Sequence, residues 1–219
     1  MQTKLGMRLS YGLSFIGLLL CLTVTGYAQD NHRLSLNAGA GVSPLVGGIS
    51  DHLENGWNVT AGAGYHFTSR FETNLQFTYN GYGVRPLVLN ELGVPGGNSH
   101  LWSLTVDPKI KLGRGDRVFD PYVVGGVGYY RRTVEFTAPT AAQVFLFDPF
   151  FDTFFTQLVP ANQVLGGITR GGVGGSGGVG FDVMLGRTGV RFFTEARYHY
   201  ADTGRIATRM VPVTFGFKW

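Results

Sequence analysis

The sequence has little cysteine and little charge, and each shortage excludes a class of protein. Its single cysteine, Cys21, lies in the apolar N-terminal segment, so the rest of the chain has neither a disulfide framework nor thiol chemistry. Only 15% of the 219 residues are charged, and the net charge of +4 falls to +2 without Lys4 and Arg8. A nucleic-acid-binding protein needs a strongly basic patch, so no nucleic-acid partner is expected.

Long apolar runs are also missing beyond the N-terminus, which excludes a helical membrane span there, since such a helix needs roughly 18 consecutive apolar residues. At the N-terminus, Lys4 and Arg8 precede an apolar run at 11–25 and the small residues of Gly26-Tyr27-Ala28. This order predicts a secretory signal peptide, residues 1–28. A retained transmembrane helix is disfavoured because the run is short. A lipoprotein signal is disfavoured because Leu20 stands where a small residue is required.

What remains, residues 29–219, is predicted to form one domain. It is rich in glycine and aromatic residues, and its apolar residues recur at every second position, as in half-buried strands. Eight segments show this alternation: 33–42, 56–67, 70–80, 101–112, 120–132, 177–186, 189–200 and 211–219. Pro108 lies within the fourth segment and predicts a bulge, because proline cannot donate a ladder hydrogen bond.

The connections between these segments alternate between short and long. The short ones are Thr68-Ser69, 113–119 and Arg187-Thr188, and the long ones are 43–55, 81–99, 134–175 and 201–208. A meander with this layout places its tight turns at one end and its long loops at the other. Outer-membrane barrels have this arrangement, with periplasmic turns and external loops. The sequence therefore predicts an all-β fold, an eight-stranded antiparallel up-and-down transmembrane β-barrel.

The polar face of the predicted strands carries charges of both signs. An eight-stranded barrel has an interior just wide enough for side chains to fill, so these charges are expected to pair there. The predicted luminal polar network consists of Glu72, Asp107, Lys109, Lys111, Asp182, Arg191, Glu195, Arg197 and Lys218. The alternative is a soluble, lipocalin-like periplasmic barrel that binds a ligand, in which this polar face meets water and the apolar face lines the interior.

The aromatic residues of the apolar face favour the membrane barrel because they fall into two bands. Phe67, Phe71 and Trp219 lie toward the short turns, whereas Trp57, Tyr79, Trp102, Tyr129 and Tyr198 lie toward the long loops. Aromatic girdles at both membrane interfaces have this distribution. Every backbone polar group must be paired in hydrocarbon, so the last strand is expected to pair with the first.

Three segments carry a resemblance to a known family: GGVGFD at 177–182, RFFTEARYHY at 191–200 and the closing VPVTFGFKW at 211–219. With the signal peptide, they resemble the small OmpA/OmpX-like barrels, the outer membrane protein beta-barrel domain family of Gram-negative bacteria. The resemblance implies location in the outer membrane and contact with its lipid and lipopolysaccharide. It also implies that the barrel-assembly machinery reads the C-terminal strand, with Trp219 in place of the more common phenylalanine.

No residue pattern points to catalysis. His66 and His199 have no serine beside them in sequence, although distant partners can complete a site in space. The glycine runs lack the lysine and following helix of a phosphate-binding loop. No cluster has metal-ligand spacing, so no enzyme, metal or cofactor is expected, and an enzyme acting on lipid A is the weakest hypothesis.

The third long loop, 134–175, is expected to carry an exposed aromatic patch, which usually marks an interface. The patch consists of Phe145, Phe147, Phe150, Phe151, Phe154 and Phe155. The loop either folds over the barrel mouth, contacts lipopolysaccharide or a surface partner, or adds strands outside the membrane. The sequence thus favours a structural, surface-interaction or adhesion role, with a narrow passive pore for small solutes as the alternative.

Overall fold

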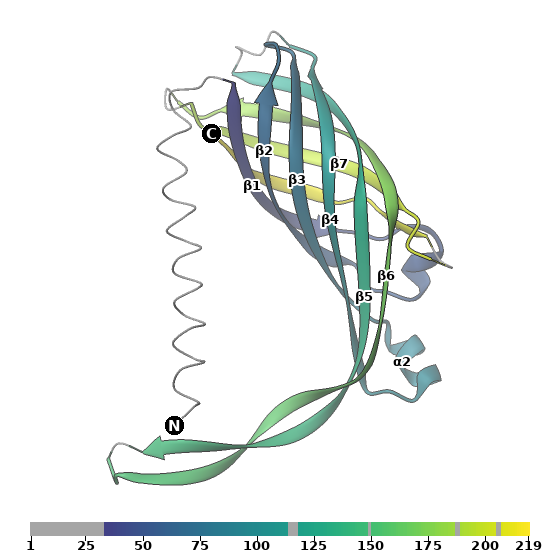
Figure 1. Ribbon diagram of the computed structural model, residues 1–219. Coiled ribbons are helices and arrows are strands. Elements are labelled where there is room, and N and C mark those ends of the chain that lie inside the picture. The colour runs from purple at the N-terminus through teal and green to yellow at the C-terminus, as the bar shows by residue number, and fades with distance from the viewer. Residues whose placement is uncertain (1–32, 114–117, 149, 187–188, 205–206) are drawn as a thin grey trace.

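The computed structural model describes residues 33–219 apart from 114–117, 149, 187–188 and 205–206. These residues form a closed antiparallel β-barrel, as predicted (Figure 1). Its wall has eight strand positions, which we call staves, and one of them is filled by two consecutive strands. The strands are β1 (Leu34–Ser43), β2 (Gly56–His66), β3 (Phe71–Gly83), β4 (Gly96–Lys111), β5 (Phe119–Asp148), β6 (Thr153–Met184), β7 (Arg191–Ala201), β8 (Thr208–Met210) and β9 (Val213–Lys218). The predicted signal peptide lies outside the described residues. Within them, no helix is long and apolar enough to span a membrane.

The ring closes between the two ends of the chain. β9 pairs with β7 on one side and with β1 on the other, so Phe217 stands opposite both Phe192 and Ala38. The pairing continues to the last residue. The N–H of Trp219 donates to the carbonyl of Leu36 at 3.0 Å, and the N–H of Leu36 donates to the carbonyl of Trp219 at 2.8 Å. The predicted closing strand is therefore confirmed.

β8 and β9 together form the eighth stave, which a break at Val211-Pro212 divides. Neighbouring backbone groups bridge this break: Val211 donates to the carbonyl of Pro44 at 2.9 Å, and Arg197 donates to the carbonyl of Pro212 at 3.1 Å. The stave begins at Thr208, earlier than the predicted 211, because β8 also pairs with β7.

The bulge predicted at Pro108 is wrong. Val106 pairs with Val127 and Lys109 pairs with Val124, so the register of β4 and β5 is the same on both sides of the proline. The ladder has a gap between these pairs, because Pro108 has no N–H, but the chain stays extended. The register of β5 and β6 shifts instead at Phe136/Thr137.

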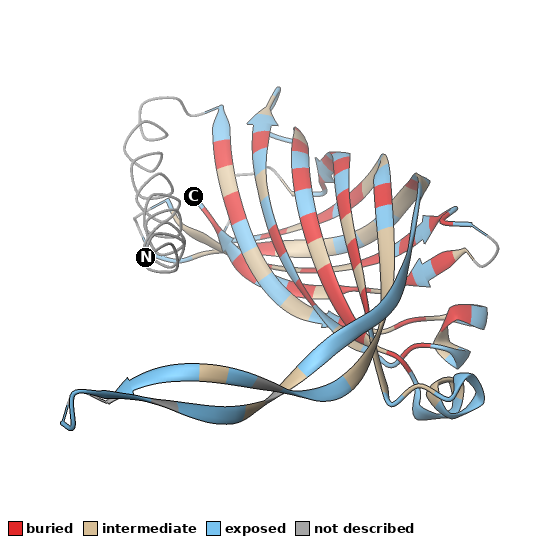
Figure 2. Ribbon diagram, turned by 60° about the horizontal axis from the view of Figure 1, so that its bottom comes forward, coloured by how far each residue is buried: buried red, intermediate tan, exposed pale blue. Residues whose placement is uncertain are grey.

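β5 and β6 continue far beyond the ring as one hairpin, pairing as far as Asp148 opposite Thr153. The segment 134–175, predicted as a long loop, is therefore mostly strand, the third of the three alternatives. Both ribbon views show the hairpin swinging away to one side of the barrel, so it does not heighten the wall evenly (Figures 1 and 2). Its β-branched and aromatic residues explain the strand conformation.

Two other long connections contain short helices at the same end of the barrel. The 3₁₀ helix η2 (Gly47–Asp51) lies between β1 and β2, and α2 (Pro86–Leu92) lies between β3 and β4. Pro86 begins α2 and Gly93 ends it with φ 64, a left-handed cap that favours glycine.

Burial alternates along each stave, as Figure 2 shows by colour. On β3, for example, Leu75 and Phe77 are 52% and 44% exposed on the outside, whereas Asn74 and Gln76 are buried inside. An apolar outer face and a polar interior suit a surrounding of lipid and are the reverse of a lipocalin, so the soluble alternative is excluded.

Candidate functional site

The structure places eight of the nine predicted luminal side chains in the barrel interior, buried, and the ninth, Arg191, half-buried near the short turns. Alternation along the strands brings them there, because inward residues of neighbouring strands share one face. They do not form a single cluster. Two separate networks and a pair near the short turns account for most of them.

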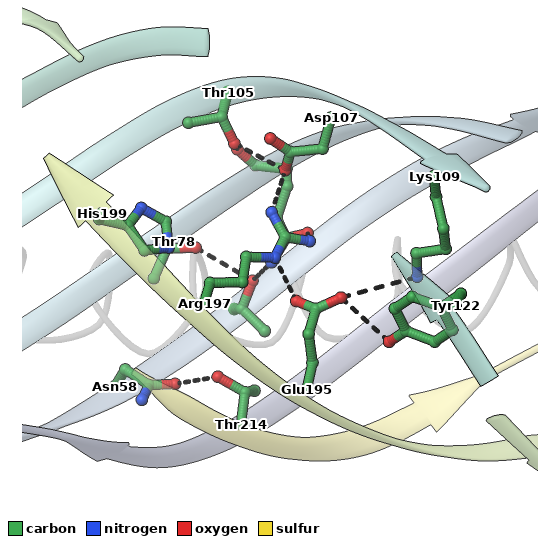
Figure 3. A network of polar contacts seen from close by, with 12 residues as sticks. Asn58, Thr78, Thr105, Asp107, Lys109, Tyr122, Glu195, Arg197, His199 and Thr214 are labelled. Carbon is green, nitrogen blue, oxygen red and sulfur yellow. Dashed lines mark hydrogen bonds and ion pairs between the residues drawn. The ribbon is translucent and has the colours of Figure 1, made fainter. Parts of the chain in front are cut away.

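The central network is built around Arg197 on β7 (Figure 3). Its Nη1 donates to Asp107 Oδ2 on β4 at 2.6 Å, its Nη2 donates to Gln76 Oε1 on β3 at 2.9 Å, and its Nε donates to Glu195. The guanidinium thus connects opposite walls of the barrel through charge-assisted hydrogen bonds, which are stronger than neutral ones.

Glu195 extends this network toward β4 and β5. Its Oε2 accepts a hydrogen bond from the hydroxyl of Tyr122 at 3.0 Å and lies 3.8 Å from the ammonium of Lys109. Lys109 also stands 4.0 Å from the centre of the Tyr122 ring. Tyr122 was not among the predicted site residues, because an aromatic residue on the polar face does not stand out in the sequence.

A second network surrounds Glu72 on β3, near the short turns. Its carboxylate accepts hydrogen bonds from Lys218 Nζ on β9 at 2.5 Å and Ser35 Oγ on β1 at 3.2 Å, and it lies 3.1 Å from His66 Nε2 on β2. These contacts connect four consecutive staves of the ring across the β1–β9 seam. They therefore reinforce the closure of the barrel.

Four charged residues near the short turns are arranged differently. Arg191 Nη1 donates to Asp120 Oδ2 at 2.8 Å, and Asp120 pairs across the strands with Asp182. Both carboxylate oxygens of Asp182 are buried without a hydrogen bond among the described residues. Lys111 is buried close by, and within the same part of the chain no hydrogen bond or ion pair engages its ammonium.

Glycines make room for the luminal networks. A Cβ atom on Gly64 would lie 2.5 Å from Glu72 Oε1 and 2.6 Å from Ser35 Oγ, and one on Gly180 would lie 2.6 Å from the Tyr122 hydroxyl. The interior is consequently filled. A cavity of about 10 Å³ remains between Lys109, Glu195 and Lys218 and their neighbours, about the size of one water molecule.

The end of the barrel that carries the long connections contains an apolar cluster that the sequence analysis missed. It consists of Leu45, Ile49, Leu53, Tyr82, Val84, Leu101, Tyr130, Ala201 and Met210, and we call it the apolar plug. The connection that contains η2 contributes Leu45, Ile49 and Leu53, which cover the interior. The available signal was that Leu101 and Met210 fall on the inward face of their strands.

The two histidines that were considered for catalysis lie in the interior or at its edge. His199 Nδ1 is 2.8 Å from the Tyr130 hydroxyl, and His66 contacts Glu72. Ser176 stands opposite His199 in the register, and its Oγ is buried. Within the described residues, no three His, Cys, Asp or Glu side chains lie close enough to hold a metal ion.

The predicted interface aromatics lie on the outer surface. Trp57 and Tyr79 form a pair 5.7 Å apart, and so do Trp102 and Tyr129, toward the long connections. Tyr198 on β7 is exposed at the same end. Toward the short turns, Phe67 and Phe71 lie 5.5 Å apart, and Trp219 is exposed.

The predicted aromatic patch lies at the tip of the β5–β6 hairpin, where Phe150 and Phe151 at the turn are 92% and 80% exposed. Phe145, Phe147 and Phe154 are exposed on the strands, and the rings of Phe147 and Phe154 contact each other at a tilt, with their centres 5.1 Å apart. Phe155 stands opposite Leu146 in the register, and its side chain lies outside the described residues.

Comparisons with known proteins agree with this fold. The chain is similar to Ail, the attachment invasion locus protein of Yersinia pestis, at 12% identity over 85% of this chain and 98% of that one, with a TM-score of 0.50. It is similar to Neisserial surface protein A at 14% identity over 84% and 95%, with a TM-score of 0.52. No curated protein sequence matches it. The profile of the family described as "Outer membrane protein beta-barrel domain" matches residues 14–218, and the chain therefore belongs to this family of outer-membrane barrels.

Proposed function

We propose that this protein is a non-conducting outer-membrane barrel of a Gram-negative bacterium that acts at the cell surface through its β5–β6 hairpin. In this proposal residues 1–28 are a cleaved signal peptide and residues 29–219 form the barrel. The observation that carries the proposal is the exposed aromatic tip of the hairpin, held outside a barrel whose interior is filled.

A filled interior argues against the pore. A solute would have to pass the network of Arg197, Glu195 and Asp107 and then the apolar plug. Both obstacles consist of side chains packed from several strands, so opening them requires breaking buried ion pairs or exposing apolar surface. Liposomes that contain the protein are expected not to swell in small sugars.

The hairpin supports a binding role because its phenylalanine side chains are exposed to solvent. Beyond Thr137 and Gly174, where β4 and β7 stop pairing, β5 and β6 pair in the sheet only with each other within the described residues. An isolated two-stranded ribbon is marginally stable in water, and an exposed apolar patch usually marks an interaction site. The hairpin therefore suits adhesion to another surface or protein. Ail, which this chain resembles in fold only, is named as an attachment protein, and that name agrees with such a role.

Two further partners belong to this proposal. The aromatic residues at both ends of the barrel suit contact with outer-membrane lipid and, on the external side, with lipopolysaccharide. The closing strand β9 with Trp219 suits recognition by the barrel-assembly machinery. We propose no catalysis, so His66→Ala and His199→Ala are expected to leave the lipid A of producing cells unchanged.

Surface attachment can be tested with cells that produce the protein at equal levels. One variant has residues 138–163 replaced by Asn-Gly, and another carries Phe150→Ser with Phe151→Ser. Both keep the barrel, which an electrophoretic mobility shift on boiling verifies. Autoaggregation and adherence to a hydrophobic surface are expected to fall in both variants. Unchanged attachment would overturn the role of the hairpin.

A further inference from the structure

The short-turn end of the barrel contains a hollow of about 560 Å³ that has not been assigned a role. The described residues of its lining carry positive charge and include no acid. The residues that line it are Arg33, His66, Phe67, Thr68, Ser69, Lys111, Met184, Gly189 and Arg191. A concave site with this charge attracts anions.

Lys111 distinguishes this hollow from a merely basic rim. Its side chain is 5% exposed, and among the residues that the structure describes no acceptor or carboxylate holds its ammonium. The other buried luminal cations have partners: Lys218 contacts Glu72, Arg197 contacts Asp107, and Lys109 contacts Glu195. A buried charge without a partner is costly, so Lys111 is positioned to receive an anion.

None of the described carboxylates nearby forms an ion pair with the ammonium group of Lys111. Glu72 is engaged by Lys218 and His66, and Asp120 is engaged by Arg191. Asp182 makes no ion pair with Lys111, although its oxygens are without hydrogen bonds among the described residues. Among these described carboxylates, Asp182 is the one that has neither a hydrogen bond nor an ion pair, so an experiment has to separate it from an external anion.

The position of the hollow indicates which anion reaches it. Phe67 both lines the hollow and contacts the ring of Phe71 in the aromatic band near the short turns. Such bands mark the level of the lipid headgroups. At this level the abundant anionic group is phosphate, which ammonium and guanidinium groups bind through charge-assisted hydrogen bonds.

We propose that this hollow binds a phosphate-bearing anion, with Lys111 as the central ligand and Arg33 at the rim. The phosphate comes either from the headgroup of an anionic phospholipid or from a free phosphate ester. Arg33 is available at the rim, where its Nη1 makes one long hydrogen bond of 3.4 Å to Tyr65. This site goes beyond the proposed surface role and lies at the opposite end of the barrel.

The test uses the full-length protein folded in a neutral detergent. Calorimetric titrations compare short-chain phosphatidylglycerol, short-chain phosphatidylcholine and glycerol phosphate. The wild type is expected to bind an anionic probe, and Lys111→Met is expected to weaken binding roughly tenfold, while Lys111→Arg retains most of it. Arg131→Gln, an exposed charge at the opposite end, is the matched control and leaves binding unchanged.

Each outcome is informative. Binding of phosphatidylglycerol alone identifies a lipid headgroup, and equal binding of glycerol phosphate identifies a free ester. If Lys111→Met does not fold, Arg33→Gln replaces it and is expected to weaken binding severalfold. If the wild type does not bind an anionic probe, the proposal is overturned. It is also overturned if Lys111→Met and Arg33→Gln bind the probe as tightly as the wild type does. If binding appears only in Asp182→Asn, Asp182 is the native partner of Lys111 and the proposal is also wrong.

Discussion

Arg197 on β7 and Asp107 on β4 form an ion pair of 2.6 Å across the barrel interior, although 90 residues separate them in sequence. Neither strand is a neighbour of the other in the ring, so the pair is a bridge between walls. Side chains from two further strands, Gln76 and Tyr122, complete its surroundings.

Arg197→Met is expected to destabilise the barrel by about 3–5 kcal/mol, because it leaves Asp107 and Glu195 buried without their partner. Urea unfolding in lipid vesicles, followed by the gel-mobility shift, measures this loss. Arg131→Gln serves as the exposed control. A loss below about 1 kcal/mol would show that water reaches these carboxylates and solvates them.

Removal of residues 211–219 is expected to abolish the mobility shift on boiling. β1 and β7 would then lose their common partner, and the backbone groups of both edges would face hydrocarbon. The measurement is electrophoresis of boiled and unboiled membrane fractions. A truncated protein that still shifted would show that β1 and β7 can close the ring without β9.

Gly64→Ala is expected to cost about 1–3 kcal/mol, because its Cβ would overlap the carboxylate of Glu72 and the hydroxyl of Ser35. Gly177→Ala is the matched control in a strand, since no atom lies within 4 Å of the place its Cβ would occupy. Equal unfolding midpoints in urea would contradict the tight fit of the interior around Glu72.

Asp182→Asn is expected to stabilise the barrel by about 1 kcal/mol. The change removes a buried charge that has no hydrogen bond among the described residues and stands opposite Asp120. The same urea titration measures the gain. A loss of stability would mean that a cation holds Asp182 in solution, and Lys111 would be the first to examine.

The sequence was sufficient to predict the barrel because strand alternation is a local property. It placed Glu72 and Lys218 on the inward face, yet it could not pair them, since their contact depends on how the staves are staggered around the ring. The apolar plug was missed because Leu101 and Met210 look like exceptions within polar rows. These two side chains are buried in an apolar cluster because the connection that contains η2 folds over them.

The hairpin was predicted as a long loop, and its sequence contains Pro139 and Pro160. In the structure these prolines stand opposite Asn162 and Ala141, in a ribbon whose two outer edges are unpaired within the described residues. Proline is tolerated at such edges, because the ladder does not need its missing N–H there. The number of neighbours that a strand has cannot be read from its own residues.

The alternation of apolar and polar residues has a consequence for export as well as for folding. A chain that is to reach the outer membrane first has to cross the inner one, where a continuous apolar run would be retained as a helix. Here Leu75 and Phe77 are separated by Gln76, and the same interleaving recurs along the other staves. The surface that faces lipid therefore exists only after the ring has formed, and residues 29–219 contain no continuous apolar run on which translocation would stop.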